Sequence, residues 1–199
     1  MLEIDDFHAY LQQSKEIDFD NAHIKKKAAV LFINTMSDIE KARIAFEFVR
    51  DEIVHTADIA SERVTCDASE VLTAREGICY AKSHLLAALL RHEEIPTGFC
   101  YQRLVLFDEP EDGYCIHALN AVYIEELDKW IRLDARGNKP GVEALFSLDV
   151  ERLAFEIRTE LDECDYPMIY AAPHPETVKT LRTHKNAITM YTRHLPQHI

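Results

Sequence analysis

The sequence predicts an α+β fold in which a buried helix packs on an antiparallel β-sheet. Apolar residues recur at three- and four-residue steps through the first half of the chain, which is the period of an amphipathic helix. After Pro96 the apolar pattern changes to alternation in segments joined by short turns, which favours antiparallel pairing. No linker divides the 199 residues, so we expect a single domain spanning residues 1–199.

Three helices are expected in the first third of the chain, at residues 2–13, 23–32 and 38–53. The last has the clearest signals, because Ser37 and Glu40 form an S-x-x-E capping box that satisfies two backbone donors at a helix start. Its apolar residues then fall on one face of the helix: Ile39, Ala42, Phe46, Val49 and Ile53.

A second helical block follows after residues 54–61, which we expect to form a loop. It begins near Ala68 and pauses at Gly77. Residues 79–91 then have a broad leucine- and alanine-rich face, which predicts a helix that is mostly buried. Pro96 prevents this helix from continuing past the preceding residue.

A meander of three strands is expected next, at residues 99–107, 114–124 and 130–134. The turns between them fall at residues 108–113 and 125–129. Strands joined by turns of this length pair antiparallel, because a parallel connection needs a longer crossover.

After the third strand the pattern weakens. Residues 136–141 carry two glycines and a proline and are expected to form a loop. Residues 155–159 are expected to form a last strand, and residues 176–181 a short helix.

The composition argues against several classes of protein. A formal net charge of −13 repels phosphate groups, which argues against nucleic acid and membrane surfaces as partners. Residues 1–7 do not resemble a signal peptide and no stretch reaches the roughly 18 apolar residues of a membrane span, so we expect a cytoplasmic protein. Five irregularly spaced cysteines without a C-x-x-C pair indicate no disulfide framework, and no metal or cofactor is expected.

Cys79 is the candidate nucleophile, because it falls in the first turn of the buried helix, two residues after Gly77. The unpaired N–H groups at a helix start and their partial positive charge stabilise a thiolate. The backbone N–H of Cys79 can also donate to a developing oxyanion, and Lys82 lies near the same face. Free cysteines are more often buried apolar residues, and that interpretation is kept for the other four: Cys66, Cys100, Cys115 and Cys164.

His117 lies in the second expected strand and Asp134 closes the third. Taken singly, a strand histidine is more often a core residue, and an aspartate in this place is often a turn former. If the helix packs on the sheet, the three groups converge, so that His117 shares the thiol proton and Asp134 fixes the imidazole tautomer. Asn138 and Asn120 are alternatives for this orienting role, since an amide can also hold an imidazole.

The motifs around these residues resemble those of the transglutaminase-like superfamily, which has a papain-like cysteine protease fold. In that family a G-x-C run opens a buried helix that ends in A-L-L-R and is followed by G-I-P. The matching runs here are Gly77-Ile78-Cys79, Ala88-Leu89-Leu90-Arg91 and Ile95-Pro96. A strand histidine and a following aspartate complete the family's triad, at steps of 117 − 79 = 38 and 134 − 117 = 17 here. Residues 130–136 also resemble its W-x-x-x-D block, so the resemblance covers about residues 71–137 and implies a triad of Cys79, His117 and Asp134.

The sequence departs from the family pattern in several places. Glu94 replaces the usual glycine at an expected left-handed position, which costs about 1 kcal/mol. Gly98 stands where a basic residue is common. No D-x-[DN]-x-[DN]-G loop occurs, so calcium activation is not implied. No upstream residue stands out as a second oxyanion donor, and Gln102 and Trp130 are the candidates.

The resemblance implies thiol-dependent acyl transfer at an amide or peptide bond through a thioester. The substrate would then be a peptide, a protein or an amide-containing small molecule. Hydrolysis is favoured because water needs no dedicated acceptor site. A protein-glutamine transglutaminase with an amine acceptor is the alternative, since its triad is the same.

Two other classes are weaker. A non-catalytic binding module that keeps the fold would have no reason to retain all three triad residues. A metal-binding protein would combine Cys115 and His117 with C-terminal histidines: His174, His184, His194 and His198. The sequence indicates no oligomeric state.

Overall fold

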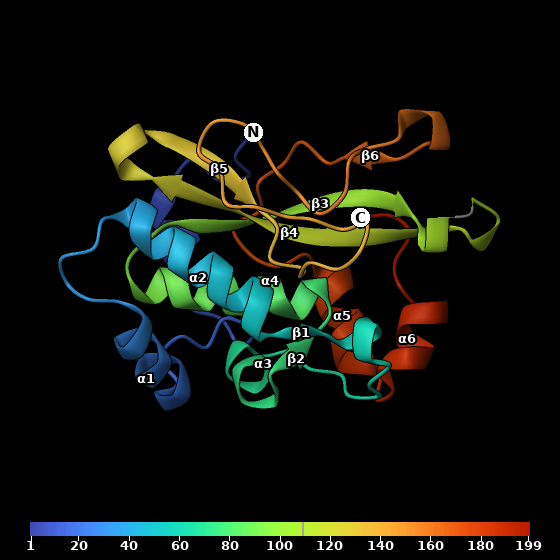
Figure 1. Cartoon of the computed structure of the whole chain (residues 1–199), viewed down its shortest axis with the longest axis horizontal. Helices are drawn as coiled ribbons and strands as arrows, with labels where there is room; N and C mark the ends of the chain where they lie inside the picture. Colours follow the sequence, from blue (N-terminus) through green and yellow to red (C-terminus); the bar gives the residue numbers. More distant parts are fainter. Residues whose placement is uncertain (109) are drawn as a thin grey trace.

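A long buried helix packed on a curled antiparallel sheet forms the centre of the fold (Figure 1). The computed structural model describes residues 1–108 and 110–199. Helix α4 (Cys79–His92) contacts β3 and β4 of the sheet and also the helices α1, α2 and α3. All of its side chains from Cys79 to Arg91 are buried. The expected α+β fold with a buried, cysteine-bearing helix is therefore confirmed.

In the described part of the chain, this sheet has four strands in the order β5-β4-β3-β6. They are β3 (Thr97–Val105), β4 (Tyr114–Ile124), β5 (Lys129–Leu133) and β6 (Cys164–Asp165). All three pairings are antiparallel, as expected for the meander. The register places Gln102 of β3 directly opposite His117 of β4.

The expected strand at residues 155–159 is wrong. All five residues are described and none pairs with the sheet; the fourth strand is instead the two-residue β6, which pairs with Arg103 and its neighbour on β3. Side chains take the place of strand partners here, because the N–H of Ala154 donates to Asp134 and the N–H of Arg158 donates to Glu163. The segment thus crosses over the sheet as a covering loop.

Three helices of the first half surround α4. They are α1 (Ala22–Leu31), α2 (Asp38–Glu52) and α3 (Ala68–Ala74). Both halves of the capping box are present, because the Ser37 hydroxyl accepts from the N–H of Glu40 and the Glu40 carboxylate accepts from the N–H of Ser37. Figure 1 shows α1 and α3 below α4 and the sheet above it, so α4 is covered from both sides.

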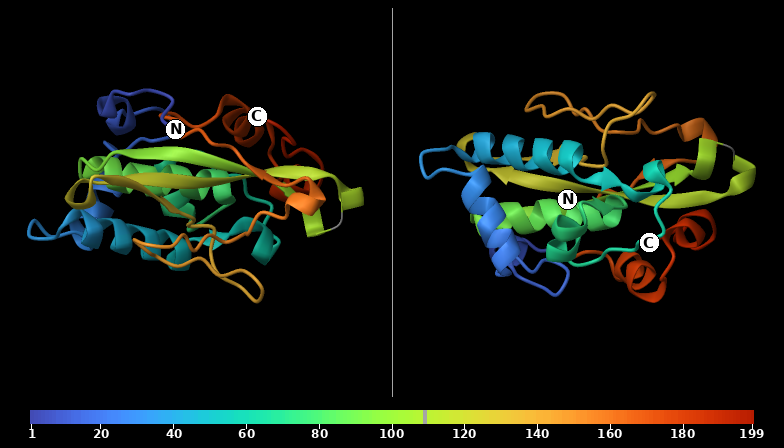
Figure 2. Two further views of the ribbon diagram at one scale, coloured as in Figure 1. Left: turned by 90° about the horizontal axis from the view of Figure 1, so that it is seen from above. Right: turned by 60° about the horizontal axis from the view of Figure 1, so that its bottom comes forward.

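The expected helix at residues 2–13 is wrong except for one short 3-10 helix, η1 (Phe7–Leu11). The first residues are extended because they pair with a distant segment, through a bridge between Leu2 and Ile169. Figure 2 shows the N-terminal segment beside the chain that leads into α5. The long-range backbone pairing therefore determines the conformation of these residues, against their local helical periodicity.

Residues 54–61 are more ordered than the expected loop. They contain strand β1 (Val54–His55) and the 3-10 helix η2 (Thr56–Ile59). Strand β1 pairs in parallel with β2 (Glu76–Gly77), so that His55 lies opposite Gly77. This small sheet fixes the chain immediately before the nucleophile candidate.

The C-terminal part supplies two helices, of which the sequence predicted one. Helix α5 (Pro175–Thr183) confirms the expected helix at residues 176–181, whereas α6 (Ala187–Arg193) was not expected. Short 3-10 helices complete the description: η3 (Leu106–Asp108), η4 (Pro110–Asp112), η5 (Glu125–Leu127) and η6 (Thr159–Leu161). Of the expected turn at 108–113, Glu109 lies outside the described residues. Over the described ranges, no helix has the length and apolar character to cross a membrane.

The two residues near the end of α4 that differ from the expected motif, Glu94 and Gly98, each have a distinct structural environment. Glu94 has φ 62°, so the expected left-handed backbone is confirmed. At Gly98, an added Cβ would lie 2.5 Å from the Ile169 side chain and 3.0 Å from the carbonyl oxygen of Tyr170. The C-terminal segment crosses β3 at this point, so any side chain at residue 98 would push it away.

Candidate active site

Cys79 is the first residue of α4, as the sequence predicted. The first helical hydrogen bond runs from the N–H of Lys82 to the carbonyl of Ile78, so the N–H of Cys79 has no partner within the helix. The chain before Cys79 can lie close to its neighbours because residue 77 is a glycine. An added Cβ there would lie 3.1 Å from the side chains of both Thr65 and Ala81. The thiol therefore sits where helix-terminal donors and dipole stabilise negative charge.

His117 and Asp134 meet beside this helix start. The imidazole Nε2 lies 2.8 Å from Oδ2 of Asp134, and both side chains are buried. The Asp134 carboxylate also accepts from the N–H of Arg136 and the N–H of Ala154, each at 3.1 Å. Cys79 lies close enough to the imidazole to contribute to its raised pKa, and Nδ1 is the ring nitrogen that does not bond to Asp134. The structure thus brings the three predicted residues together in one row.

The charges and hydrogen bonds around His117 and Asp134 favour the ionised form of each side chain. Burial alone would lower the pKa of His117, but the charges and hydrogen bonds of Asp134 and Cys79 outweigh it and raise that pKa to about 10. Burial likewise disfavours the carboxylate, yet the imidazolium and the two N–H donors hold the pKa of Asp134 below its usual range. An imidazolium held against the Asp134 carboxylate is the arrangement that results.

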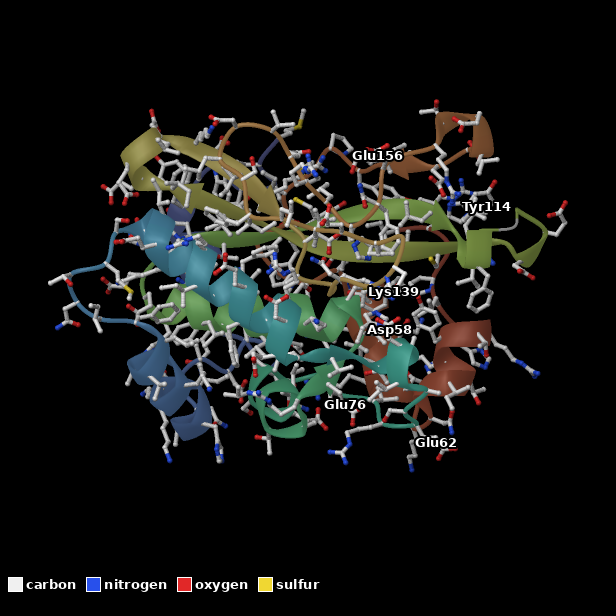
Figure 3. All side chains as sticks on the ribbon, in the orientation of Figure 1. Asp58, Glu62, Glu76, Tyr114, Lys139 and Glu156 are labelled. Carbon is white, nitrogen blue, oxygen red and sulfur yellow. The ribbon has the colours of Figure 1, made fainter. Side chains whose placement is uncertain are left out.

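A second charged pair lies next to the thiol, and the sequence did not reveal it. Arg136, which is 4% exposed, donates to both oxygens of Asp58 at 2.5 and 2.8 Å. The negative charge of Asp58 and that of Cys79 both raise the pKa of Arg136 against the effect of burial. Lys139 donates to the same carboxylate at 3.0 Å, and Figure 3 shows Lys139 just above Asp58. The 78-residue separation of Arg136 and Asp58 left no local signal.

Lys82 does not assist the thiol, contrary to the expectation. Its ammonium group donates to the carbonyl oxygens of Ile53 and Arg50, just past and within the last turn of α2. Burial lowers the pKa of Lys82 to about 7, and the charge of Arg136 adds to this shift. Its role in the structure is to satisfy the carbonyls at the end of a helix.

The alternatives for the orienting role lie elsewhere. The Asn138 side chain accepts from the N–H of Ala144 and donates to its carbonyl, which closes a loop. The Asn120 amide donates to the carbonyl oxygens of Ser83 and Gly98, which ties α4 to β3. Of the three candidates, Asp134 is therefore the one that bonds to the imidazole.

A groove of about 1090 Å³ runs past Cys79 and His117. Phe155, from the covering loop, packs edge-on against the imidazole with ring centroids 5.0 Å apart. Gln102 and His55 also line the groove; both are buried, and Oε1 of the amide and Nδ1 of the imidazole have no hydrogen-bond partner in the described ranges. Periodicity could not find Phe155 or His55, because each belongs to a segment mispredicted in type.

Of the two expected oxyanion-donor candidates, only one borders the groove. Gln102 lines the groove beside His117, because the two residues lie opposite each other on β3 and β4. The Trp130 ring packs instead against Phe7 and Tyr10, with centroids 5.6 and 5.0 Å away. Trp130 is therefore part of an aromatic cluster and not of the groove wall.

The proposed histidine and cysteine ligands do not gather into a metal site. Among the residues that the structure describes, one group has three potential ligand atoms in range, namely Glu16, Cys66 and Asp67. The guanidinium of Arg182 bonds to both of these carboxylates, so a cation already occupies this position. The cluster is thus an ion-pair network between distant segments.

Comparison with known proteins agrees with this fold. The sequence profile of the Transglutaminase-like superfamily matches residues 26–135, more than half of the chain. A crystal structure described as a putative cysteine protease from Cytophaga hutchinsonii is similar, with a TM-score of 0.52 and 21% identity. The match covers 67% of this chain and 43% of that one, so this chain spans less than half of that protein's length. No curated protein sequence matches the chain.

Proposed function

Because this chain belongs to the transglutaminase-like superfamily, we propose that it is a thiol-dependent acyl-transfer enzyme with Cys79, His117 and Asp134 as its triad. One observation carries the proposal: a buried imidazole bonds to a carboxylate through Nε2 and lines the same groove as the thiol of Cys79. The reaction that fits best is hydrolysis of an amide or peptide bond.

The thiolate of Cys79 attacks the carbonyl carbon of the substrate, and the carbonyl electrons move to its oxygen. The resulting oxyanion accepts a hydrogen bond from the backbone N–H of Cys79, which has no partner in α4. Arg136, beside the thiol, stabilises negative charge in the same region. Asp134 keeps the imidazolium oriented so that its Nδ1–H faces the reacting atoms.

The tetrahedral intermediate collapses when the bond to the leaving nitrogen breaks and His117 gives that nitrogen its proton. A thioester on Cys79 remains. Water then attacks the thioester while His117 removes a proton from it. The carbon–sulfur bond breaks, which releases the acid and restores the thiolate and the imidazolium.

Hydrolysis is preferred to transamidation because the groove is open and needs no further element to admit water. An amine acceptor would require a second binding region across the thioester from the acyl group. The thioester itself is common to both reactions, so the acceptor decides between them.

Acylation of Cys79, followed by partition of the thioester, tests the proposal. The protein would be mixed with an N-acyl p-nitrophenyl ester, with and without excess glycine ethyl ester, and followed by intact mass spectrometry and product analysis. We expect transient acylation at Cys79 and mainly the free acid as product. A dominant amide product would identify a transglutaminase, and no acylation of the folded protein would indicate a binding module.

A further inference from the structure

A side pocket of about 260 Å³ opens from the groove next to the nucleophile. Its walls include Ala57 of η2, Ile78, Phe107, and Ile188 and Tyr191 of α6. Ile78 directly precedes Cys79, so the side pocket borders the start of α4. Ile78, Phe107 and Tyr191 also line the groove, which makes the two spaces continuous.

Large apolar residues in the lining of the side pocket are partly exposed. Phe107 is 53% exposed and Ile188 is 43% exposed, although both are large hydrophobic residues. The rings of Phe107 and Tyr191 are tilted by 53° to each other, with centroids 6.2 Å apart. Exposed apolar surface at a concave site is the usual mark of a ligand-binding region.

The charged residues that line the side pocket already have partners. Arg136 and Lys139 both donate to Asp58, and the charge of Cys79 also acts on Arg136. A charged group entering the side pocket would compete with these pairs and lose its hydration. An uncharged apolar group would gain from burial without disturbing them.

The size of the side pocket fits one side chain. An apolar cavity of about 150 Å³ is large enough to hold benzene. The 260 Å³ found here therefore accommodates a phenylalanine or leucine side chain. It is too small for a folded partner or a long peptide segment.

The position of the side pocket relative to Cys79 and His117 decides which part of a substrate enters it. His117 protonates the leaving group, so the leaving group lies on the β4 side of Cys79. The side pocket is built from η2, α6 and the residues beside them, and His117 is not among its lining residues. Resting on the proposed function, we infer that the side pocket is a specificity subsite for an uncharged apolar side chain on the acyl side of the scissile bond.

Active esters test this subsite. The panel consists of N-acetyl dipeptide p-nitrophenyl esters in which one position is alanine and the other is alanine, phenylalanine or aspartate. The measured quantity is the second-order rate of Cys79 acylation, read as the burst of p-nitrophenolate. We expect a phenylalanine ester to react at least about tenfold faster than the all-alanine ester, and the aspartate esters to be slower.

Two variants link that preference to the side pocket. Ile188→Asp places a charge in the wall, and Ala57→Phe narrows the space from an exposed position. Each should reduce the phenylalanine-to-alanine rate ratio to within about threefold of one. Ile33→Asp is the matched control, since Ile33 is 60% exposed between α1 and α2, and it should keep the wild-type ratio.

The outcomes separate the two proposals. If no ester acylates Cys79 in the wild-type protein, the proposed function fails, and the subsite with it. If the esters acylate Cys79 without a phenylalanine preference, or with a preference for aspartate, the subsite is overturned and the acyl-transfer function stands. A preference that survives in both folded pocket variants would also overturn it.

Discussion

The Nε2 atom of His117 lies 2.8 Å from Oδ2 of Asp134, which leaves Nδ1 of the same ring for Cys79. The pair is shielded from water, because both side chains are at most 4% exposed and Phe155 covers the ring. Its geometry explains how a buried imidazole can stay protonated beside a carboxylate.

Asp134→Asn should reduce acylation of Cys79 by about two orders of magnitude or more, because an amide favours a different tautomer of His117. The measurement is the burst rate with an active ester. Asn138→Ala is the matched control, since Asn138 closes the 138–144 loop without touching the imidazole. If Asn138→Ala alone slowed the burst, the orienting residue would be Asn138.

Three buried histidines should differ sharply in their titration by NMR. With a pKa of about 10, His117 should stay protonated through neutral pH, whereas burial lowers the pKa of His84 to about 4. Burial and the charge of Arg136 hold the pKa of His55 well below its usual range. A neutral His117 at pH 7 in the wild-type protein would contradict the ion-pair arrangement.

The same shift gives the pH dependence of stability. The pKa of His117 is raised on folding from an unfolded value of about 6.5. The pair with Asp134 therefore stabilises the fold fully below that value, and the stabilisation is lost as the pH rises through about 10. Denaturant unfolding at several pH values, compared with His117→Gln, would measure it; an unchanged difference between pH 6 and pH 11 would argue against it.

His55 is expected to be the second oxyanion donor. It lies opposite Gly77, on the helix-start side of Cys79, and its buried Nδ1 has no partner within residues 1–108 and 110–199. His55→Phe keeps the aromatic contact with Tyr191 and removes the donor, so acylation should fall by about 10²-fold.

Alkylation by iodoacetamide is the internal control for that variant, because it forms no oxyanion at a carbonyl. The alkylation rate of Cys79 should therefore stay unchanged in His55→Phe. Gln102→Leu tests the other buried groove residue in the same two assays. An acylation defect in Gln102→Leu and none in His55→Phe would assign the donor to Gln102.

Glu94→Gly should stabilise the protein by about 0.5–1 kcal/mol, because glycine adopts positive φ without the steric cost that Glu94 bears at φ 62°. Glu93→Gly is the matched control, since its φ of −91° suits any residue and glycine should only destabilise there. Chemical denaturation of the two variants gives the comparison. Equal effects would show that the backbone at residue 94 stores no strain.

Most of the fold that positions the site could be predicted from the sequence. The capping box of Ser37, the apolar face after Cys79 and the alternation around His117 are local patterns, and each gave an element of the right type. The convergence of the triad followed from the expected packing of helix on sheet.

The parts of the structure that the sequence did not predict depend on contacts between residues far apart in the chain. Strand β6 has two residues and exists because β3 offers it a free edge. The Arg136–Asp58 pair and the Phe155 contact join segments whose own patterns are weak. The need for glycine at residue 98 also depends on a distant segment, because residues 169–170 cross the chain there.

The most direct test of the central claim is the rate of alkylation at each cysteine between pH 5 and pH 9, read by peptide mass spectrometry. We predict that Cys79 reacts fastest at pH 6, ahead of the exposed Cys164, and that His117→Ala abolishes this advantage. The buried Cys66 and Cys100 should be slow, since burial raises the pKa of each thiol to about 12. A Cys79 that reacts no faster than Cys164 at pH 6, or equally fast without His117, would contradict an activated nucleophile.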